Sequence, residues 1–136
     1  MRTATFSLSL VICVAYVACN RAPQRDTPSK PSLSNVIHVS IRRSLLDSST
    51  SVLQIHNTSR TPLRGLRVWF TNQDSQQRVS HDIDVINPQQ TAEIGTLECG
   101  WALEPNERVF VFQDEYKHLV FTTYRAENGA VGIRMD

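Results

Sequence analysis

The sequence carries almost no net charge, and this absence excludes one large class of partners. Fourteen basic and thirteen acidic side chains give the 136-residue chain a formal charge of +1. From residue 33 onward there are ten basic and twelve acidic side chains. Nucleic acid favours a concentrated basic surface, so we expect no nucleic-acid partner. A composition of 40% hydrophobic and 20% charged residues indicates a globular chain of one domain, and we expect it to fold without a cofactor.

Familiar catalytic motifs are also missing. The chain contains no Gly-x-Ser-x-Gly, His-Glu-x-x-His or cysteine–histidine signature. The densest polar cluster is "HDID", residues 81–84. On a strand, Asp82 and Asp84 share one face, whereas His81 shares the other face with Ile83, so the three polar side chains do not converge on a metal ion. We therefore predict no catalytic residue and no metal site, and we interpret the cluster as a solvated strand face.

A long apolar run is absent as well, although a short one opens the chain. Met1 and Arg2 give a positive start, and residues 4–18 contain no charged side chain. A helix that spans the hydrocarbon core needs about 20 apolar residues, whereas a secretion signal has a shorter apolar core. We predict that residues 1–18 are a cleaved signal peptide. An uncleaved short anchor is the alternative.

The end of this run, "YVAC" at residues 16–19, resembles the lipobox of bacterial lipoproteins, in which small residues precede a modified cysteine. The resemblance implies that the thiol of Cys19 receives diacylglycerol, that the signal is cut before it, and that the new amino terminus is acylated. Two or three acyl chains hold a protein stably at a membrane. The implied location is therefore extracytoplasmic and membrane-anchored in the bacterial cell envelope, and Asn20 is compatible with the outer membrane. The alternative is an ordinary signal cut near Ala18, which would leave Cys19 free to bridge to Cys99.

Residues 19–32 have the composition of a flexible tether. They include three prolines, charges of both signs and no large apolar side chain. A chain of this kind is extended or coil-like and separates a domain from its anchor. The predicted organisation is thus a signal peptide (1–18), a tether (19–32) and one folded domain (33–136).

Within the folded domain the apolar residues recur with a period of two, which is typical of half-buried strands, and no sustained helical stripe occurs. The alternating apolar positions are Ile37, Val39 and Ile41; Leu53 and Ile55; Leu66, Val68 and Phe70; Ile83 and Val85; Ala92 and Ile94; Val109 and Val111; Leu119 and Phe121; and Val131 and Ile133. Seven or eight short strands in about 100 residues predict two antiparallel sheets packed face to face, an all-β, immunoglobulin-like sandwich.

Two segments carry a further resemblance. "VLQIHNTSRTPLRGLRVWFTNQ" and "INPQQTAEIGTL" are similar to bacterial extracytoplasmic sandwich modules of the FxLYD type, in which an asparagine–serine turn precedes a strand and a proline turn follows it. The resemblance implies an envelope accessory or interaction module and gives a role to no individual residue. The paired cysteines of antibody domains are absent, so packing alone must hold the sheets together. Residues 57–59 also match the N-glycosylation acceptor pattern, which matters only in a eukaryotic secretory pathway.

Turn chemistry supports the strand prediction. Asn128-Gly129 tolerates positive φ and predicts a tight type I′ hairpin between the last two strands. The segments "INPQQTAEI" (86–94) and "LEPNERVFV" (103–111) share one pattern: an apolar residue, a polar residue, proline, polar residues and then a new apolar alternation. We expect two strands to end and two to begin at equivalent proline turns.

A candidate binding surface follows from the third predicted strand. Arg67 and Trp69 alternate with its apolar residues and therefore share one side, and exposed arginine and tryptophan are typical of recognition surfaces. Adding two further aromatic residues, we predict a partner-binding surface of Arg67, Trp69, Trp101 and Tyr116, facing another envelope protein or a glycan. The alternative is that Trp69 belongs to the core and that Phe70 faces a loop.

These observations lead to a lipid-anchored envelope protein that carries a non-catalytic binding or structural module. Two other classes stay open. A carbohydrate- or small-ligand-binding module would bring Trp69, Trp101 and Tyr116 together on one concave face. A secreted hydrolase would place a histidine within hydrogen-bond reach of a serine or of Cys99 in a cleft.

Overall fold

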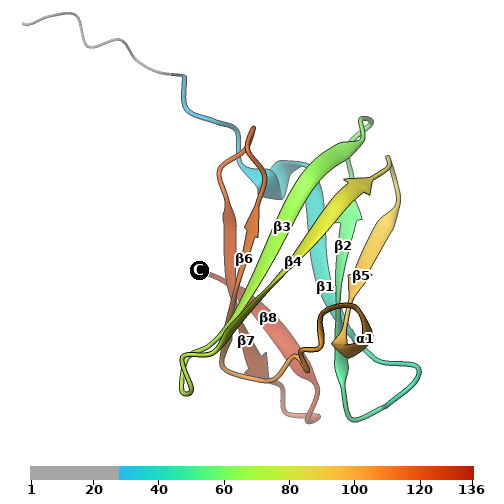
Figure 1. The fold of residues 1–136 in the computed structure, drawn as a ribbon, viewed down its shortest axis with the longest axis vertical. Coiled ribbons are helices and arrows are strands. Elements are labelled where there is room, and N and C mark those ends of the chain that lie inside the picture. Colours follow the sequence, from blue (N-terminus) through green and yellow to red (C-terminus); the bar gives the residue numbers. More distant parts are fainter. Residues whose placement is uncertain (1–27) are drawn as a thin grey trace, which may run out of the picture.

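The structure is a computed structural model that describes residues 28–136. Eight strands in two antiparallel sheets make up most of this part of the chain (Figure 1). The elements are η1 (Leu33–Asn35), β1 (Ile37–Arg43), β2 (Ser51–Asn57), β3 (Leu63–Asn72), β4 (Arg78–Ile86), β5 (Thr91–Ile94), α1 (Thr96–Cys99), β6 (Glu107–Phe112), β7 (Leu119–Arg125) and β8 (Val131–Met135). The predicted all-β sandwich is therefore confirmed. The predicted signal peptide, Cys19 and most of the predicted tether lie outside the described residues.

The strand order matches an immunoglobulin-like arrangement. One sheet has the order β1-β2-β5, and the other has the order β4-β3-β6-β7-β8. Strands A, B and E of immunoglobulin domains likewise face strands C, F and G. Here β4 pairs with β3, the position that an additional strand takes in variable domains, and β8 extends the second sheet beyond β7. Within residues 28–136 no helix has the length and hydropathy needed to cross a bilayer.

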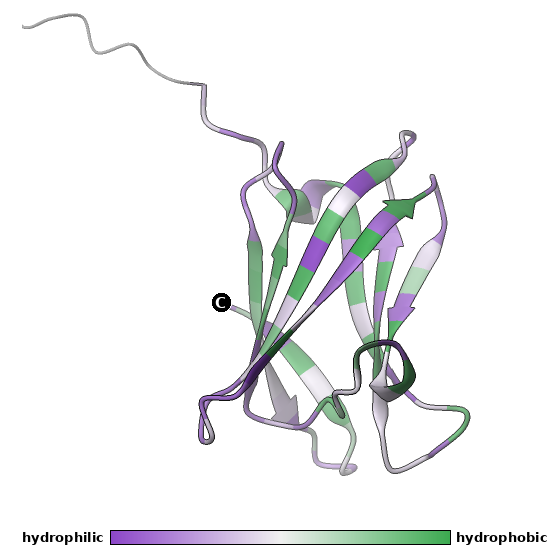
Figure 2. Ribbon diagram, viewed as in Figure 1, coloured by the Kyte–Doolittle hydropathy of each residue, from purple (hydrophilic) through white to green (hydrophobic). Residues whose placement is uncertain are grey.

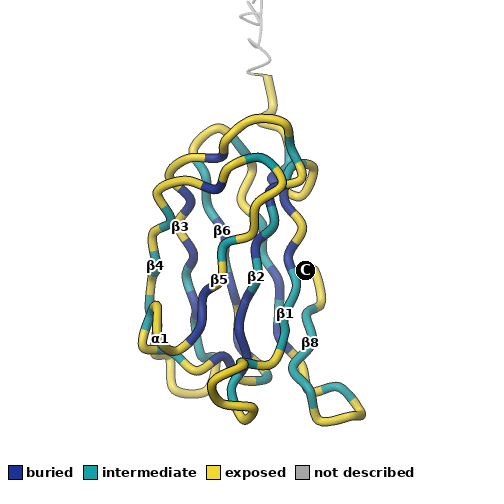
Figure 3. Tube along the Cα trace, turned by 90° about the vertical axis from the view of Figure 1, so that its right-hand side faces the viewer, coloured by how far each residue is buried: buried dark blue, intermediate teal, exposed yellow. Residues whose placement is uncertain are grey.

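The core lies between the two sheets and is built by the alternation read from the sequence. Along β3, Leu66, Val68 and Phe70 are buried while Arg67 is exposed. Figure 2 shows apolar and polar residues alternating along this strand, and Figure 3 shows the buried stretches running between the sheets. Since each apolar side chain withdrawn from water contributes about 1.5–3 kcal/mol, this interior supplies the main stabilisation. The alternative that Trp69 belongs to the core and Phe70 faces a loop is wrong.

Asn57, at the end of β2, joins the two sheets. Its side chain is fully buried, and its Nδ2 donates to the carbonyl oxygens of Thr61 at 2.8 Å and Ile86 at 2.9 Å. Its Oδ1 accepts from the backbone N–H of Ser59 at 2.9 Å and from the Ser59 hydroxyl at 2.7 Å. Because Ile86 ends β4 in the opposite sheet, the buried amide is fully bonded and bridges both layers. A glycan attached to Asn57 would therefore be incompatible with this buried position.

The body of the domain begins slightly before Leu33, where the sequence placed its start. The backbone N–H of Lys117 donates to the Pro31 carbonyl at 2.8 Å, and Leu33 N–H donates to the Lys117 carbonyl at 3.2 Å. Leu33 itself is fully buried in the core. The last residues of the predicted tether are thus attached to the loop between β6 and β7.

The two proline segments form similar turns, but in different settings. Gln89 and Asn106, each directly after a proline, both have positive φ, at 60° and 68°, as expected for the third residue of a type II turn. The first turn connects β4 to β5, as predicted. The prediction that a strand ends at the second turn is wrong, because α1 and an irregular segment lie between β5 and that turn.

The second proline turn is closed by a side chain from another strand. Thr123 of β7 donates its hydroxyl proton to the Glu104 carbonyl at 2.6 Å and accepts from the Glu107 N–H at 2.8 Å. Its own carbonyl accepts from the Asn106 N–H at 2.9 Å. In an ordinary turn the carbonyl of the first residue accepts directly from the N–H of the fourth. Here the Thr123 hydroxyl lies between these two groups, the Glu104 carbonyl and the Glu107 N–H, and bonds to both.

The final hairpin pairs β7 with β8, as predicted, but its turn differs. Gly129 N–H donates to the Ala126 carbonyl at 2.9 Å, and Ala126 N–H donates to the Ala130 carbonyl at 2.8 Å. Gly129 has φ 77°, whereas Asn128 is not among the positive-φ residues. This pattern is a type I turn followed by a left-handed glycine, so the predicted type I′ turn is wrong.

We expect Asn57→Ala to lower the free energy of unfolding by about 3 kcal/mol, because it leaves the Thr61 and Ile86 carbonyls without their buried donor. Urea denaturation followed by tryptophan fluorescence measures this change. The matched control is Asn87→Ala, whose exposed amide bonds only to the Gln90 side chain and should change the stability by less than about 0.5 kcal/mol. Equal losses in the two variants would contradict the bridging role of Asn57.

Candidate functional site

The outer side of the five-stranded sheet carries an aromatic surface, which we call the Trp69 face and define as Arg67, Trp69, Phe110 and Phe112. Trp69 on β3 is the cross-strand partner of Phe110 on β6, and Arg67 is the partner of Phe112. Because side chains alternate along both strands, all four point away from the core. The sequence predicted the β3 half of this face, and the structure adds Phe110 and Phe112 of β6.

The aromatic rings of the Trp69 face are in contact. The centroids of Trp69 and Phe112 lie 5.1 Å apart at 60°, and those of Phe110 and Phe112 lie 6.1 Å apart at 8°. His118 continues the row at 5.6 Å from Phe112. Such pairs fix ring positions relative to one another. The face is therefore an organised platform and not a set of independent exposed rings.

Charged groups flank these rings. Arg67 donates through Nε to Asp82 Oδ1 on β4 at 2.7 Å, and this guanidinium lowers the pKa of Asp82. Arg108 lies over the Phe110 ring at 5.5 Å from its centroid and donates to Asp136 Oδ2 at 3.1 Å. These exposed pairs contribute little to stability. Their main effect is to hold the guanidinium groups beside the rings.

Three shallow depressions meet at Trp69. They measure about 470, 370 and 340 Å³, and Trp69 lines each of them. The second is lined by Arg78, Arg108, glutamines, a threonine and the rings, and by no carboxylate. The indole Nε1 of Trp69 is covered from solvent and has no hydrogen-bond acceptor among the described residues. The donors that the face offers beside its flat apolar rings are therefore side-chain groups such as those of Arg78 and Arg108.

Trp101 and Tyr116 do not join this face. Both pack against the core cluster. Trp101 donates through Nε1 to Glu107 Oε1 at 3.0 Å, and Glu107 shares the inner side of β6 with the buried valines of that strand. Trp101 and Trp69 are thus on opposite sides of the sheet. Of the four predicted surface residues, the structure brings together only Arg67 and Trp69.

The neighbourhood of Trp101 contains a buried carboxyl group. Glu107 is 1% exposed, and its Oε2 has no hydrogen-bond partner among the described residues. Burial raises the pKa of Glu107, and the Trp101 hydrogen bond opposes this increase. Burial also raises the pKa of the nearby Cys99 thiol, which donates to the Gly95 carbonyl at 3.2 Å. A half-buried thiol with a raised pKa is a poor nucleophile.

Three of the four histidines lie on separate strands, His118 lies in the loop before β7, and they do not form a catalytic pair in the described part of the chain. His38 and His56 are cross-strand partners on the outer side of the three-stranded sheet, and His56 shares a hydrogen bond of 3.0 Å with Thr91. His81 lies on β4 in the alternation that the sequence predicted, with Asp82 and Asp84 on the other side. Among residues 28–136 no histidine bonds to a serine or to Cys99, and no cluster of metal-ligand side chains forms.

Comparison with known proteins adds no further constraint. No family model, no curated protein and no solved structure matches the chain. The chemistry of the Trp69 face must therefore be interpreted from its own residues.

We expect stability to depend on the ionisation of Glu107. Because burial raises its folded-state pKa above the ordinary 4.5, the stability linked to the protonated carboxyl is fully present below pH 4.5 and is lost as the pH rises through the raised pKa. Glu107→Gln should remove this decline. Urea denaturation at a series of pH values between about 4 and 8 measures it.

The control for this experiment is Glu127→Gln, in the exposed turn before β8. It should keep the wild-type pH dependence, because an exposed carboxyl is not desolvated by folding. A Glu107→Gln protein with the same pH profile as the wild type would show that Glu107 is not the group responsible.

Proposed function

We propose that the protein is a lipid-anchored component of the bacterial cell envelope, and that its sandwich is a non-catalytic binding module acting through the Trp69 face. The lipid anchor is supported by the lipobox-like sequence that ends at Cys19. In this proposal the signal peptide is removed and the tether holds the domain outside the cytoplasm. Figure 1 is compatible with such a tether, because the segment that leads into η1 approaches one end of the sandwich and does not run across a sheet face.

The observation that carries the binding role is the ring contact between Trp69 and Phe112 on an outer sheet face, with Arg67 as the cross-strand partner of Phe112. Tryptophan and arginine are enriched among residues that dominate binding energy. Here β-sheet register and ring contacts hold these groups in place, so little conformational entropy is lost when a partner binds. An outer strand face with no partner would ordinarily carry polar side chains, as β1 does with His38 and Ser40.

The occupant of this face is another envelope protein or a glycan. A protein partner suits a shallow surface with rings at its centre and charged pairs at its edge. A glycan is the second candidate, because the depression beside Arg78 combines flat rings with side-chain amides and guanidinium groups. The near-neutral charge of the folded domain argues against nucleic acid.

The lipid anchor is tested by the intact mass of the membrane-extracted protein. We expect a mature chain without residues 1–18 that carries acyl chains on Cys19, and a Cys19→Ser protein that carries none. An unmodified, soluble wild-type product would overturn the anchor. This measurement is independent of any binding activity.

The Trp69 face is tested by photo-crosslinking from single positions in intact cells. A crosslinker at Thr71 on β3, which lines a depression of this face, should give a discrete adduct that a Trp69→Ser change reduces by about tenfold. His38, on the outer side of the other sheet, is the matched control position and should give no such adduct. If no protein adduct forms, Trp69-dependent sedimentation with purified cell-wall glycan would identify a glycan ligand. Failure of both would refute the binding role.

A further inference from the structure

A second surface lies at the end of the sandwich that carries α1 and the loop between β1 and β2, opposite the end at which the segment leading into η1 lies (Figure 1). Three leucines are strongly exposed there: Leu45 by 89%, Leu46 by 80% and Leu97 by 77%. Leu45 and Leu46 belong to the loop between β1 and β2, whereas Leu97 belongs to α1. Single exposed leucines are ordinary, but three from distant segments that line one depression indicate an interaction surface. We call these three residues the distal leucine surface.

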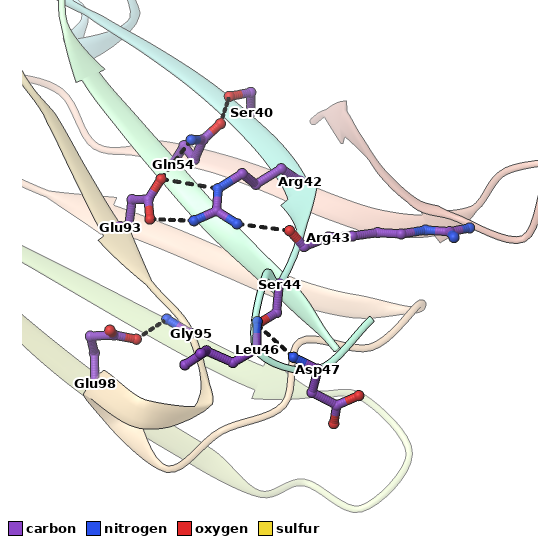
Figure 4. A network of polar contacts seen from close by, with 10 residues as sticks. All are labelled: Ser40, Arg42, Arg43, Ser44, Leu46, Asp47, Gln54, Glu93, Gly95 and Glu98. Atoms are coloured by element: carbon purple, nitrogen blue, oxygen red, sulfur yellow. Dashed lines mark hydrogen bonds and ion pairs between the residues drawn. The ribbon is translucent and has the colours of Figure 1, made fainter. Parts of the chain in front are cut away.

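The distal leucine surface encloses a real concavity. Together with Val52 and polar residues of both segments, the leucines line a depression of about 450 Å³. Figure 4 shows the side chain of Leu46 extending from its loop toward Gly95 and Glu98. An apolar side chain from a partner can therefore enter between the loop and α1.

Hydrogen bonds hold the loop that presents Leu45 and Leu46. The hydroxyl of Ser44 accepts from the N–H groups of Leu46 at 3.2 Å and Asp47 at 3.3 Å. The loop is closed by Thr50 N–H donating to the Asp47 carbonyl at 3.0 Å and by Ser44 N–H donating to the Thr50 carbonyl at 2.9 Å. The leucines are thus displayed by an ordered turn, which reduces the entropy lost on binding.

The rim of this surface is acidic. Its charged lining residues are Arg42, Asp47, Glu93 and Glu98. Arg42 forms an ion pair with Glu93, and Figure 4 shows its two hydrogen bonds. The Nε of Arg42 donates to Glu93 Oε1 at 3.0 Å, and its Nη2 donates to Glu93 Oε2 at 2.5 Å. Neither Asp47 nor Glu98 forms an ion pair within the described residues. The rim therefore keeps uncompensated negative charge around an apolar centre.

This charge distinguishes between the possible occupants. Two copies of the surface brought face to face would place acidic rims against each other, which is unfavourable. Anionic lipid headgroups would be repelled for the same reason. A segment with apolar side chains on one face and basic side chains at its edges would complement both features. We propose that the distal leucine surface docks an amphipathic, basic segment of a partner protein, separately from the Trp69 face.

The test uses the full chain carrying Cys19→Ser and a short amphipathic peptide of leucine and lysine, with binding measured by calorimetry. The peptide should bind, and Leu46→Ser combined with Leu97→Ser should weaken Kd by at least ~10-fold. Asp47→Asn combined with Glu98→Gln should weaken binding and reduce its salt dependence. Met135→Ser is the matched control, because Met135 is also exposed, by 51%, but lies on β8; it should leave Kd unchanged.

A peptide of the same pattern with glutamate in place of lysine should not bind. The proposal is overturned if the leucine–lysine peptide does not bind, or if the leucine variants bind it as well as the wild type does. It is also overturned if the leucine variants instead abolish sedimentation with phosphatidylglycerol vesicles, or abolish a dimer seen by analytical ultracentrifugation. Thermal unfolding of each variant verifies that these exposed substitutions leave the fold intact.

Discussion

The buried amide of Asn57 is the constraint on which the sandwich depends. Two sheets that are not joined by a disulfide can slide against each other, because apolar packing has little directional preference. Asn57 removes this freedom by donating to a carbonyl at the end of β4 while its own strand belongs to the other sheet. The same residue accepts two bonds from Ser59 and so shapes the crossover into β3. Asn57 therefore acts together with the pairing of β3 to β4 and β6 in placing the Trp69 face.

Much of the fold could be predicted because a sheet with one buried face leaves a period-two pattern in the sequence. All eight strands were located in this way, and so was the outward direction of Arg67 and Trp69 on β3. Loop residues leave no such pattern. Trp101 and Tyr116 lie in irregular segments, so their packing against the core depends on tertiary contacts that the sequence does not display.

The same limit explains the other differences between sequence and structure. The turn before β8 is set by the strand register it must close, and Asn-Gly is compatible with more than one turn type. Phe110 and Phe112 could have been added to the face from the alternation of β6, once β6 was known to pair with β3. The distal leucine surface could not be predicted from the sequence, because it combines a loop and a short helix that are distant in sequence.

Thr123 makes the closure of one turn depend on a later strand. Its hydroxyl closes the turn at Pro105, yet it belongs to a strand that follows this turn in the sequence. The first residues of β6 therefore reach their final geometry only after β7 has paired with them, and a non-local closure of this kind slows folding. A nascent chain that ends before residue 123 would leave the backbone N–H of Glu107 without the hydroxyl that accepts its hydrogen bond.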